Sequence, residues 1–129
     1  MPGFEMHLIA GALGALLMQG YPRAALALLV GSVFPDIDSR SSVTHRLSLI
    51  SLGVFSMILL YPHGLLASVA ATLAITGAFL LLLPKHRNWL HKTKGQLLFS
   101  LLCFVLTFDL LVAFSGIIGT TIHRILDGI

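Results

Sequence analysis

Histidine and aspartate residues close to the ends of apolar segments are the side chains best suited to chemistry in this 129-residue chain. Neutral imidazole and carboxylate groups are the N and O ligands of zinc and similar divalent ions. His123 and Asp127 are four positions apart, so on a helix both project from one face. Asp36 and Asp38 alternate, so an extended segment would aim both carboxylates the same way. These spacings are typical of a metal site.

Two further histidines, His86 and His91, are five positions apart, which is about 140° around a helix. They share a site only if His86 lies in a loop, and Pro84 favours that arrangement. His7 lies near the expected start of the first helix, and the spacing leaves the role of His45 open. Each residue taken alone also has a simpler interpretation as an interfacial anchor, a loop carboxylate or a surface hydrogen bond. A single metal site explains all of them together.

The composition shows what kind of protein must position these residues. Hydrophobic residues make up 57% of the chain and charged residues 10%, with a mean hydropathy of +0.96. An ordinary soluble domain has about 25% charged residues, and a disordered chain has more, so both classes are excluded. The net charge of +3 is too small and scattered for a nucleic-acid partner, and a single cysteine, Cys103, forms no internal disulfide. We therefore expect the lipid bilayer to cover part of the surface.

Prolines and charged residues divide the chain into six Leu- and Ala-rich segments without period-2 alternation, which predicts helices. Turn signals at residues 20–23 and 61–64 predict two helical hairpins, and a third turn is expected somewhere from Thr107 to Gly116. The alternative for that last stretch is one long helix with Asp109 in the middle of the membrane, which is energetically unfavourable. Of the six segments, only Leu65 to Leu83 approaches the roughly 20 residues that span a bilayer.

The predicted fold is therefore an all-α, polytopic integral membrane helical bundle of about three hairpins, some with short helices, forming a single domain over residues 1–129. This topology brings five of the six histidines and three of the five acids to one membrane face. Most basic residues fall on the same face, namely Arg40, Arg46, Lys85, Arg87, Lys92, Lys94 and Arg124, against Arg23 on the other. By the positive-inside rule, the candidate site should face the cytoplasm.

Four motifs in a fixed order resemble the membrane-bound predicted metal-dependent hydrolases, a family that includes LexA-regulated hydrolases of the inner membrane. The motifs are Met6-His7, Pro35-Asp36-Ile37-Asp38, His86-Arg87-Asn88-Trp89-Leu90-His91 and His123-Arg124-Ile125-Leu126-Asp127. The family is thought to be distantly related to zinc-dependent phospholipases C and single-strand nucleases. Asn88, Leu90, Lys92 and Ile122 depart from the usual family pattern, and so does the C-terminal end at Ile129.

The resemblance implies a ligand set and an activity. The implied metal ligands are His7, Asp36, Asp38, His86, His91, His123 and Asp127. Zinc is the expected metal, with manganese as an alternative, and Asp36 or Asp38 is expected to position a catalytic water. Arg87, Lys92 and Arg124 are candidates for binding phosphate. The hypothesis is a metal-dependent hydrolase acting on a phosphoester, such as a phospholipid, at the membrane interface. The alternatives are a metal-binding membrane protein with a structural or transport role, and a scaffold whose polar residues only solvate helix ends.

Overall fold

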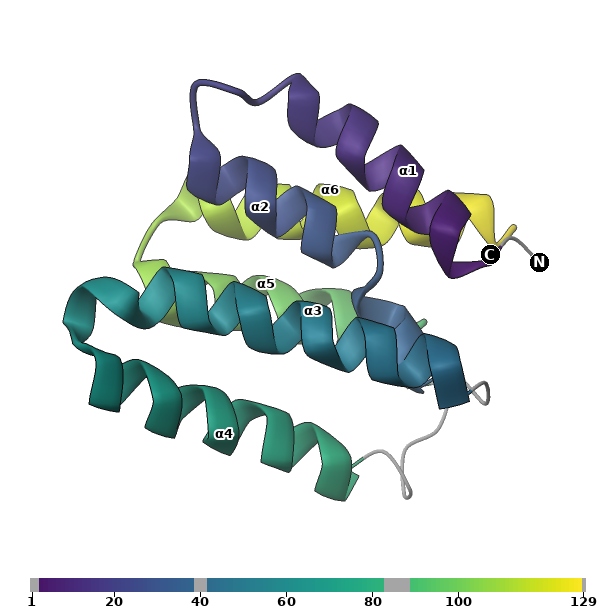
Figure 1. The fold of residues 1–129 in the computed structure, drawn as a ribbon. Coiled ribbons are helices and arrows are strands. Elements are labelled where there is room, and N and C mark those ends of the chain that lie inside the picture. The colour runs from purple at the N-terminus through teal and green to yellow at the C-terminus, as the bar shows by residue number, and fades with distance from the viewer. Residues whose placement is uncertain (1–2, 39–41, 83–88, 129) are drawn as a thin grey trace.

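The computed structural model describes residues 3–38, 42–82 and 89–128, and over these residues it contains helices and no strands (Figure 1). The predicted all-α fold is confirmed. The six α-helices are paired as three consecutive hairpins, α1 with α2, α3 with α4 and α5 with α6. The elements are α1 (Phe4–Leu16), α2 (Pro22–Gly31), the 3-10 helix η1 (Phe34–Asp38), α3 (Ser42–Leu60), the 3-10 helix η2 (Tyr61–His63), α4 (Leu65–Leu82), α5 (Thr93–Thr107) and α6 (Leu110–Leu126).

The three hairpin turns have identifiable causes in the sequence. Pro22 begins α2, where its missing N–H is no loss, and Gly64 takes a positive φ of 105° directly before α4. Phe108 ends α5 in the left-handed conformation, and Asp109 caps α6 by accepting a 2.9 Å hydrogen bond from the Leu111 N–H. The third turn thus falls in the expected interval, and Asp109 lies in the turn instead of mid-helix.

The lengths of the helices differ from expectation in one place. The stretch Val43–His63 is the only helix of the described residues that is long and apolar enough to cross a membrane, with 21 residues and a mean hydropathy of 1.7. The sequence instead favoured the segment that became α4. The difference arises because α3 begins at Ser42 and continues through His45 and Arg46, which were expected to lie before the helix.

Close packing of α2 against α6 forms the centre of the bundle. A Cβ added to Gly119 would lie 2.2 Å from the Leu28 carbonyl oxygen, and one added to Gly31 would lie 2.8 Å from the Gly116 carbonyl oxygen. Only glycines permit so close a backbone approach. Figure 1 shows α6 behind α2 and α5 behind α3, with α4 on the outside.

An aromatic cluster fills the interior next to this contact. The rings of Phe34 and Phe99 lie 4.6 Å apart, and Phe79 meets Phe34 edge-on at 5.4 Å. Because Phe34 is fully buried and begins η1, the cluster fixes the short helix that carries the two aspartates. The start of α1 and the end of α6 lie at the same end of the bundle as η1, as Figure 1 shows.

Candidate metal centre

Three histidines and three aspartates converge at the end of the bundle where α1 begins and α6 ends. His7 comes from α1, Asp36 and Asp38 from η1, His91 from the turn before α5, and His123 and Asp127 from the end of α6. They form seven carboxylate–imidazole pairs at 2.8–4.0 Å. The structure thus joins residues from all four sequence motifs in one cluster.

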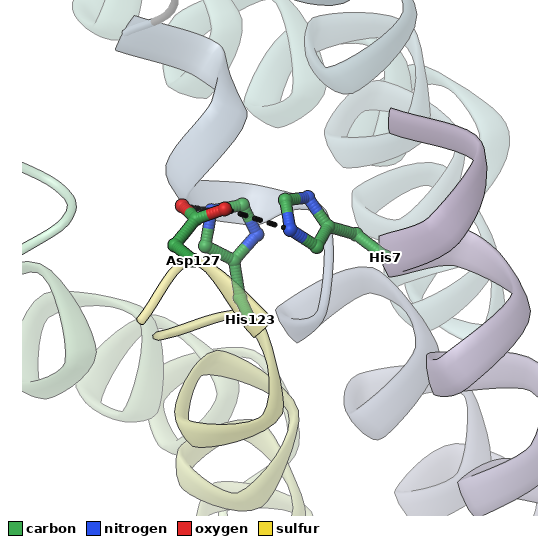
Figure 2. Close-up of side chains that lie close together, drawn as sticks. All are labelled: His7, His123 and Asp127. Carbon is green, nitrogen blue, oxygen red and sulfur yellow. Dashed lines mark ion pairs between the residues drawn. The ribbon is translucent and has the colours of Figure 1, made fainter. Parts of the chain in front are cut away.

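His7 connects the two carboxylates on either side of it. Its Nδ1 atom lies 3.1 Å from Oδ2 of Asp36, and its Nε2 atom lies 3.0 Å from Oδ1 of Asp127. Figure 2 shows the His7 ring reaching from α1 toward Asp127, with the His123 ring beside it. The first helix and the last helix therefore share one polar contact in the interior.

His123 is oriented by a backbone carbonyl. Its Nδ1–H donates a 2.7 Å hydrogen bond to the Ser32 carbonyl oxygen, which can only accept. The proton on Nδ1 leaves the Nε2 lone pair of the neutral ring facing Asp127 Oδ2 at 3.0 Å and Asp36 Oδ1 at 3.6 Å. A lone pair that faces two carboxylate oxygens is repelled unless a cation or a proton lies between them.

His91 is held by Asp38 in a similar way. Oδ2 of Asp38 accepts a 2.9 Å hydrogen bond from the Leu90 N–H, and Oδ1 lies 2.8 Å from Nδ1 of His91, although not in line for a good hydrogen bond. The opposite ring atom, Nε2, then faces Asp127 Oδ2 at 3.6 Å and Asp36 Oδ1 at 4.0 Å. This is the arrangement of carboxylates that support metal-binding histidines from behind.

These groups fit a divalent cation. Two overlapping sets have ligand atoms within 4.8 Å of one another, His7 with His123 and Asp127, and Asp36 with His91 and His123. Neighbouring ligand atoms on a tetrahedral zinc with bonds of 2.0–2.1 Å are about 3.3 Å apart, close to the 3.0–3.6 Å separations of His123 Nε2 from the two carboxylates. Among the described residues, Nε2 of His7 and of His123 is buried without a hydrogen-bond partner. Buried polar atoms without partners are costly, and a bound cation would satisfy both.

The exposure of the side chains shows from which side an ion is able to reach the cluster. The side chains of His7, His123 and Asp127 are at most 3% exposed, whereas His91 is 17% and Asp36 is 11% exposed. Any ion or small molecule therefore reaches the cluster past His91 and Asp36.

Burial and charge act in opposite directions on His91. Burial lowers the pKa of its imidazole, but contact with Asp38 and the charges of Asp38, Asp127 and Asp36 outweigh burial and raise the pKa above the usual 6.5.

Local packing fixes the elements that carry the cluster. A Cβ added to Gly11 would lie 2.0 Å from the Ser32 hydroxyl, so α1 approaches the end of α2 closely and brings His7 to Asp36. His45, whose role the sequence left open, donates through Nδ1–H to the Ile37 carbonyl oxygen of η1. His45 thus holds η1 from α3 and is not among the residues that could share an ion.

The remaining residues that the sequence predicted for the site are not among the two sets of ligand candidates. His86 and Arg87 lie outside the described residues. Lys92 is exposed directly before α5, and Arg124 donates through Nη1 to Gln96 Oε1 at 2.7 Å and to Thr93 Oγ1 at 3.4 Å. Asp38, expected as a ligand, belongs to neither of the two sets: its Oδ2 accepts from the Leu90 N–H, and its Oδ1 lies 2.8 Å from His91 Nδ1.

Two groups that position the cluster could not be predicted from the sequence, because they are backbone atoms. The Ser32 carbonyl fixes the ring of His123, and the Leu90 N–H fixes Asp38. Backbone donors and acceptors carry no residue signature. The available signal was position, because Leu90 lies within the third motif and Ser32 lies three residues before Pro35, where the second motif begins.

Comparisons of the chain with protein-family models, with curated proteins and with solved structures find no match. The geometry of the cluster and the surface of the bundle are therefore the features that indicate a function.

Proposed function

We propose that this protein is a membrane-embedded, metal-dependent hydrolase that acts on a phosphoester at the membrane interface. The observation that carries the proposal is the convergence of His7, Asp36, His91, His123 and Asp127, in which the buried Nε2 atoms of both His7 and His123 lack a hydrogen-bond partner. Zinc is the metal that this N/O set suits, and manganese is the alternative.

The surface of the bundle supports a location in the membrane. Only 28% of the apolar stretch in α3 is buried inside the protein, so it differs from the core helix of a soluble domain. Leu66, Leu73 and Leu81 on α4 are 84%, 67% and 78% exposed. So large an apolar surface indicates contact with lipid. We infer a polytopic bundle in which the helices shorter than the bilayer contribute partial spans.

The chemistry of a hydrolase follows from the metal and from the residues that surround it. A bound zinc ion lowers the pKa of a coordinated water to about 7 and polarises phosphoryl oxygens. Asp36 is the better candidate for orienting the attacking water, because it lies on the accessible side of the cluster, whereas Asp38 is held behind His91. Arg124, held by Gln96 and Thr93 near the turn that carries His91, and Lys92, next to His91, are the described cations that we propose to pair with a phosphate group.

One observation favours a second candidate, a structural metal site without turnover. Structural zinc sites are closed, whereas catalytic sites keep a position open for water or substrate. Three of the five ligand candidates are at most 3% exposed, as in a closed site. The partial exposure of Asp36 and His91 favours the hydrolase.

The experiment that separates the two is turnover by metal-loaded protein in lipid nanodiscs. A panel of phospholipid and soluble phosphoesters should show hydrolysis that a chelator abolishes and zinc or manganese restores. Asp127→Asn should lose both metal and activity. Asp109→Asn is the matched control, because Asp109 is at the opposite end of the bundle and asparagine also caps helices. Full metal occupancy without turnover on any phosphoester would favour the structural site.

We further propose that the cluster faces the cytoplasm. At the end of the bundle that holds the cluster, the described basic residues are Arg46, Lys92, Lys94 and Arg124, against Arg23 at the other end. Cysteine labelling in intact cells tests this, because the native Cys103 is buried. His63→Cys should react with an impermeant reagent and Ser42→Cys should not. The reverse pattern would invert the orientation.

A further inference from the structure

A second feature lies beside the candidate metal centre, an apolar groove of about 230 Å³ between α1, α2 and α3. Eight of its nine lining residues are apolar. The only polar one, Ser51, donates its hydroxyl to the Leu47 carbonyl oxygen within α3. The groove therefore offers no charged side chain and no free side-chain hydrogen-bond donor.

The groove ends next to the cluster. Val33 and Leu8 line it, and each is close in sequence to a cluster residue, because Leu8 follows His7 and the Val33 carbonyl accepts the Asp36 N–H. From Val33 the lining continues along α2 to Leu26, about 10 Å away at 1.5 Å per residue. The groove thus leads from the polar end of the bundle toward its middle.

The side of the groove formed by α3 belongs to the helix that is able to cross a membrane. Ile50 and Val54 line the groove within the stretch Val43–His63 and are 61% and 53% exposed. Residues so exposed on a membrane-crossing helix meet acyl chains and not water. The open side of the groove thus faces lipid, so an acyl chain is able to enter the groove without passing through water.

We propose that this groove binds one acyl chain of a membrane phospholipid whose phosphate group reaches the His/Asp cluster. This inference rests on the proposed function and names its substrate as a lipid phosphoester. An apolar channel that begins beside a candidate phosphoester site matches the two halves of a phospholipid, a charged phosphate and a hydrocarbon tail. The groove then selects lipid over soluble phosphoesters, because each buried methylene adds to the binding free energy.

The test uses the metal-loaded full-length protein in phosphatidylcholine nanodiscs that contain a phosphatidylglycerol with a photoreactive diazirine in one acyl chain. Crosslinks should concentrate on residues 26–33 and 50–55 over the exposed residues of α4. Val54→Trp should fill the groove from its exposed edge and lower labelling of residues 26–33 about tenfold, as expected for roughly two methylenes displaced. Ile58→Trp is the matched control, because Ile58 is also 53% exposed on α3 but does not line the groove.

Labelling spread evenly over the exposed apolar residues, or equal losses with Val54→Trp and Ile58→Trp, would overturn the proposal. A helical circular-dichroism spectrum and an unchanged melting temperature verify that each variant folds.

Kinetics distinguish this inference from the hydrolase proposal itself. Val54→Trp should raise the KM for phosphatidylglycerol about tenfold and leave kcat/KM unchanged for a soluble aryl phosphodiester without an acyl chain. Turnover of both substrates unaffected by Val54→Trp would reject the groove and keep the hydrolase. Groove labelling sensitive to Val54→Trp, without turnover of any phosphoester, would keep the lipid site and reject the hydrolase.

Discussion

His7, near the start of the chain, lies with its Nε2 atom 3.0 Å from Oδ1 of Asp127, near the end of the chain. The contact is buried, with side-chain exposures of 2% and 3%. Because it links α1 to α6, whatever fills the space beside it ties the first and last helices together. The stability of the bundle is thereby coupled to the occupancy of the cluster.

Metal loading should therefore stabilise the protein. A ligand that binds only the folded state adds about 2.7 kcal/mol when its free concentration is 100 times its dissociation constant. We expect zinc to raise the melting temperature of the chelator-treated protein and to bind at one or more equivalents by elemental analysis. The melting temperature of His123→Ala should respond to zinc far less. A preparation that holds less than a tenth of an equivalent of any transition metal, purified without chelator, would refute metal binding.

Asp38 and Asp127 should differ in their contributions. Asp38 supports His91 from behind, and loss of such a supporting carboxylate typically weakens metal affinity 10–100-fold. Asp127 lies 3.0–3.6 Å from the Nε2 atoms of three histidines, so Asp127→Asn should abolish measurable zinc binding while Asp38→Asn only weakens it. Isothermal titration with a competing chelator measures both. Equal losses in the two variants would show that Asp38 is itself a ligand.

As the pH is lowered, metal affinity should begin to fall at a higher pH than it would for an unperturbed histidine. A histidine must be neutral to bind a metal. Burial lowers the pKa of His91, but its contact with Asp38 and the nearby carboxylate charges outweigh burial and raise the pKa above 6.5. Below that raised pKa, protons compete with the metal, so affinity is constant above it and declines as the pH falls through it. In zinc affinity measured from pH 5 to 9, the break between the constant and the declining range should lie above pH 6.5, the value expected for an unperturbed imidazole. Asp38→Asn should move the onset to lower pH.

The close contact of α2 with α6 should tolerate no side chain. Gly119→Ala would place a Cβ 2.2 Å from the Leu28 carbonyl oxygen, which forces the helices apart and moves His123 away from Ser32. We expect a loss of more than about 2 kcal/mol in stability and weaker metal binding. Gly77→Ala is the matched control, because a Cβ there meets nothing within 4 Å and alanine favours a helix. Equal stability of the two variants in chemical denaturation would contradict the packing.

The sequence by itself determined the all-helical class, the three turns and the order of the polar motifs, but not the start of α3 at Ser42. These features are local, since Pro22, Gly64 and Asp109 act on the backbone next to them. It also predicted the pairing of His123 with Asp127, because four positions on a helix fix their relation.

Only the tertiary structure decided which position each aspartate and histidine takes within the cluster. Asp36 and Asp38 are indistinguishable by sequence, yet the Leu90 N–H and His91 hold Asp38 behind the site while Asp36 faces His7 and His123. The contact of His45 with Ile37 and that of His123 with the Ser32 carbonyl likewise depend on how α2, α3 and α6 pack. Residue types restrict which groups are able to bind a metal, but the side on which each atom lies depends on packing between segments distant in the chain.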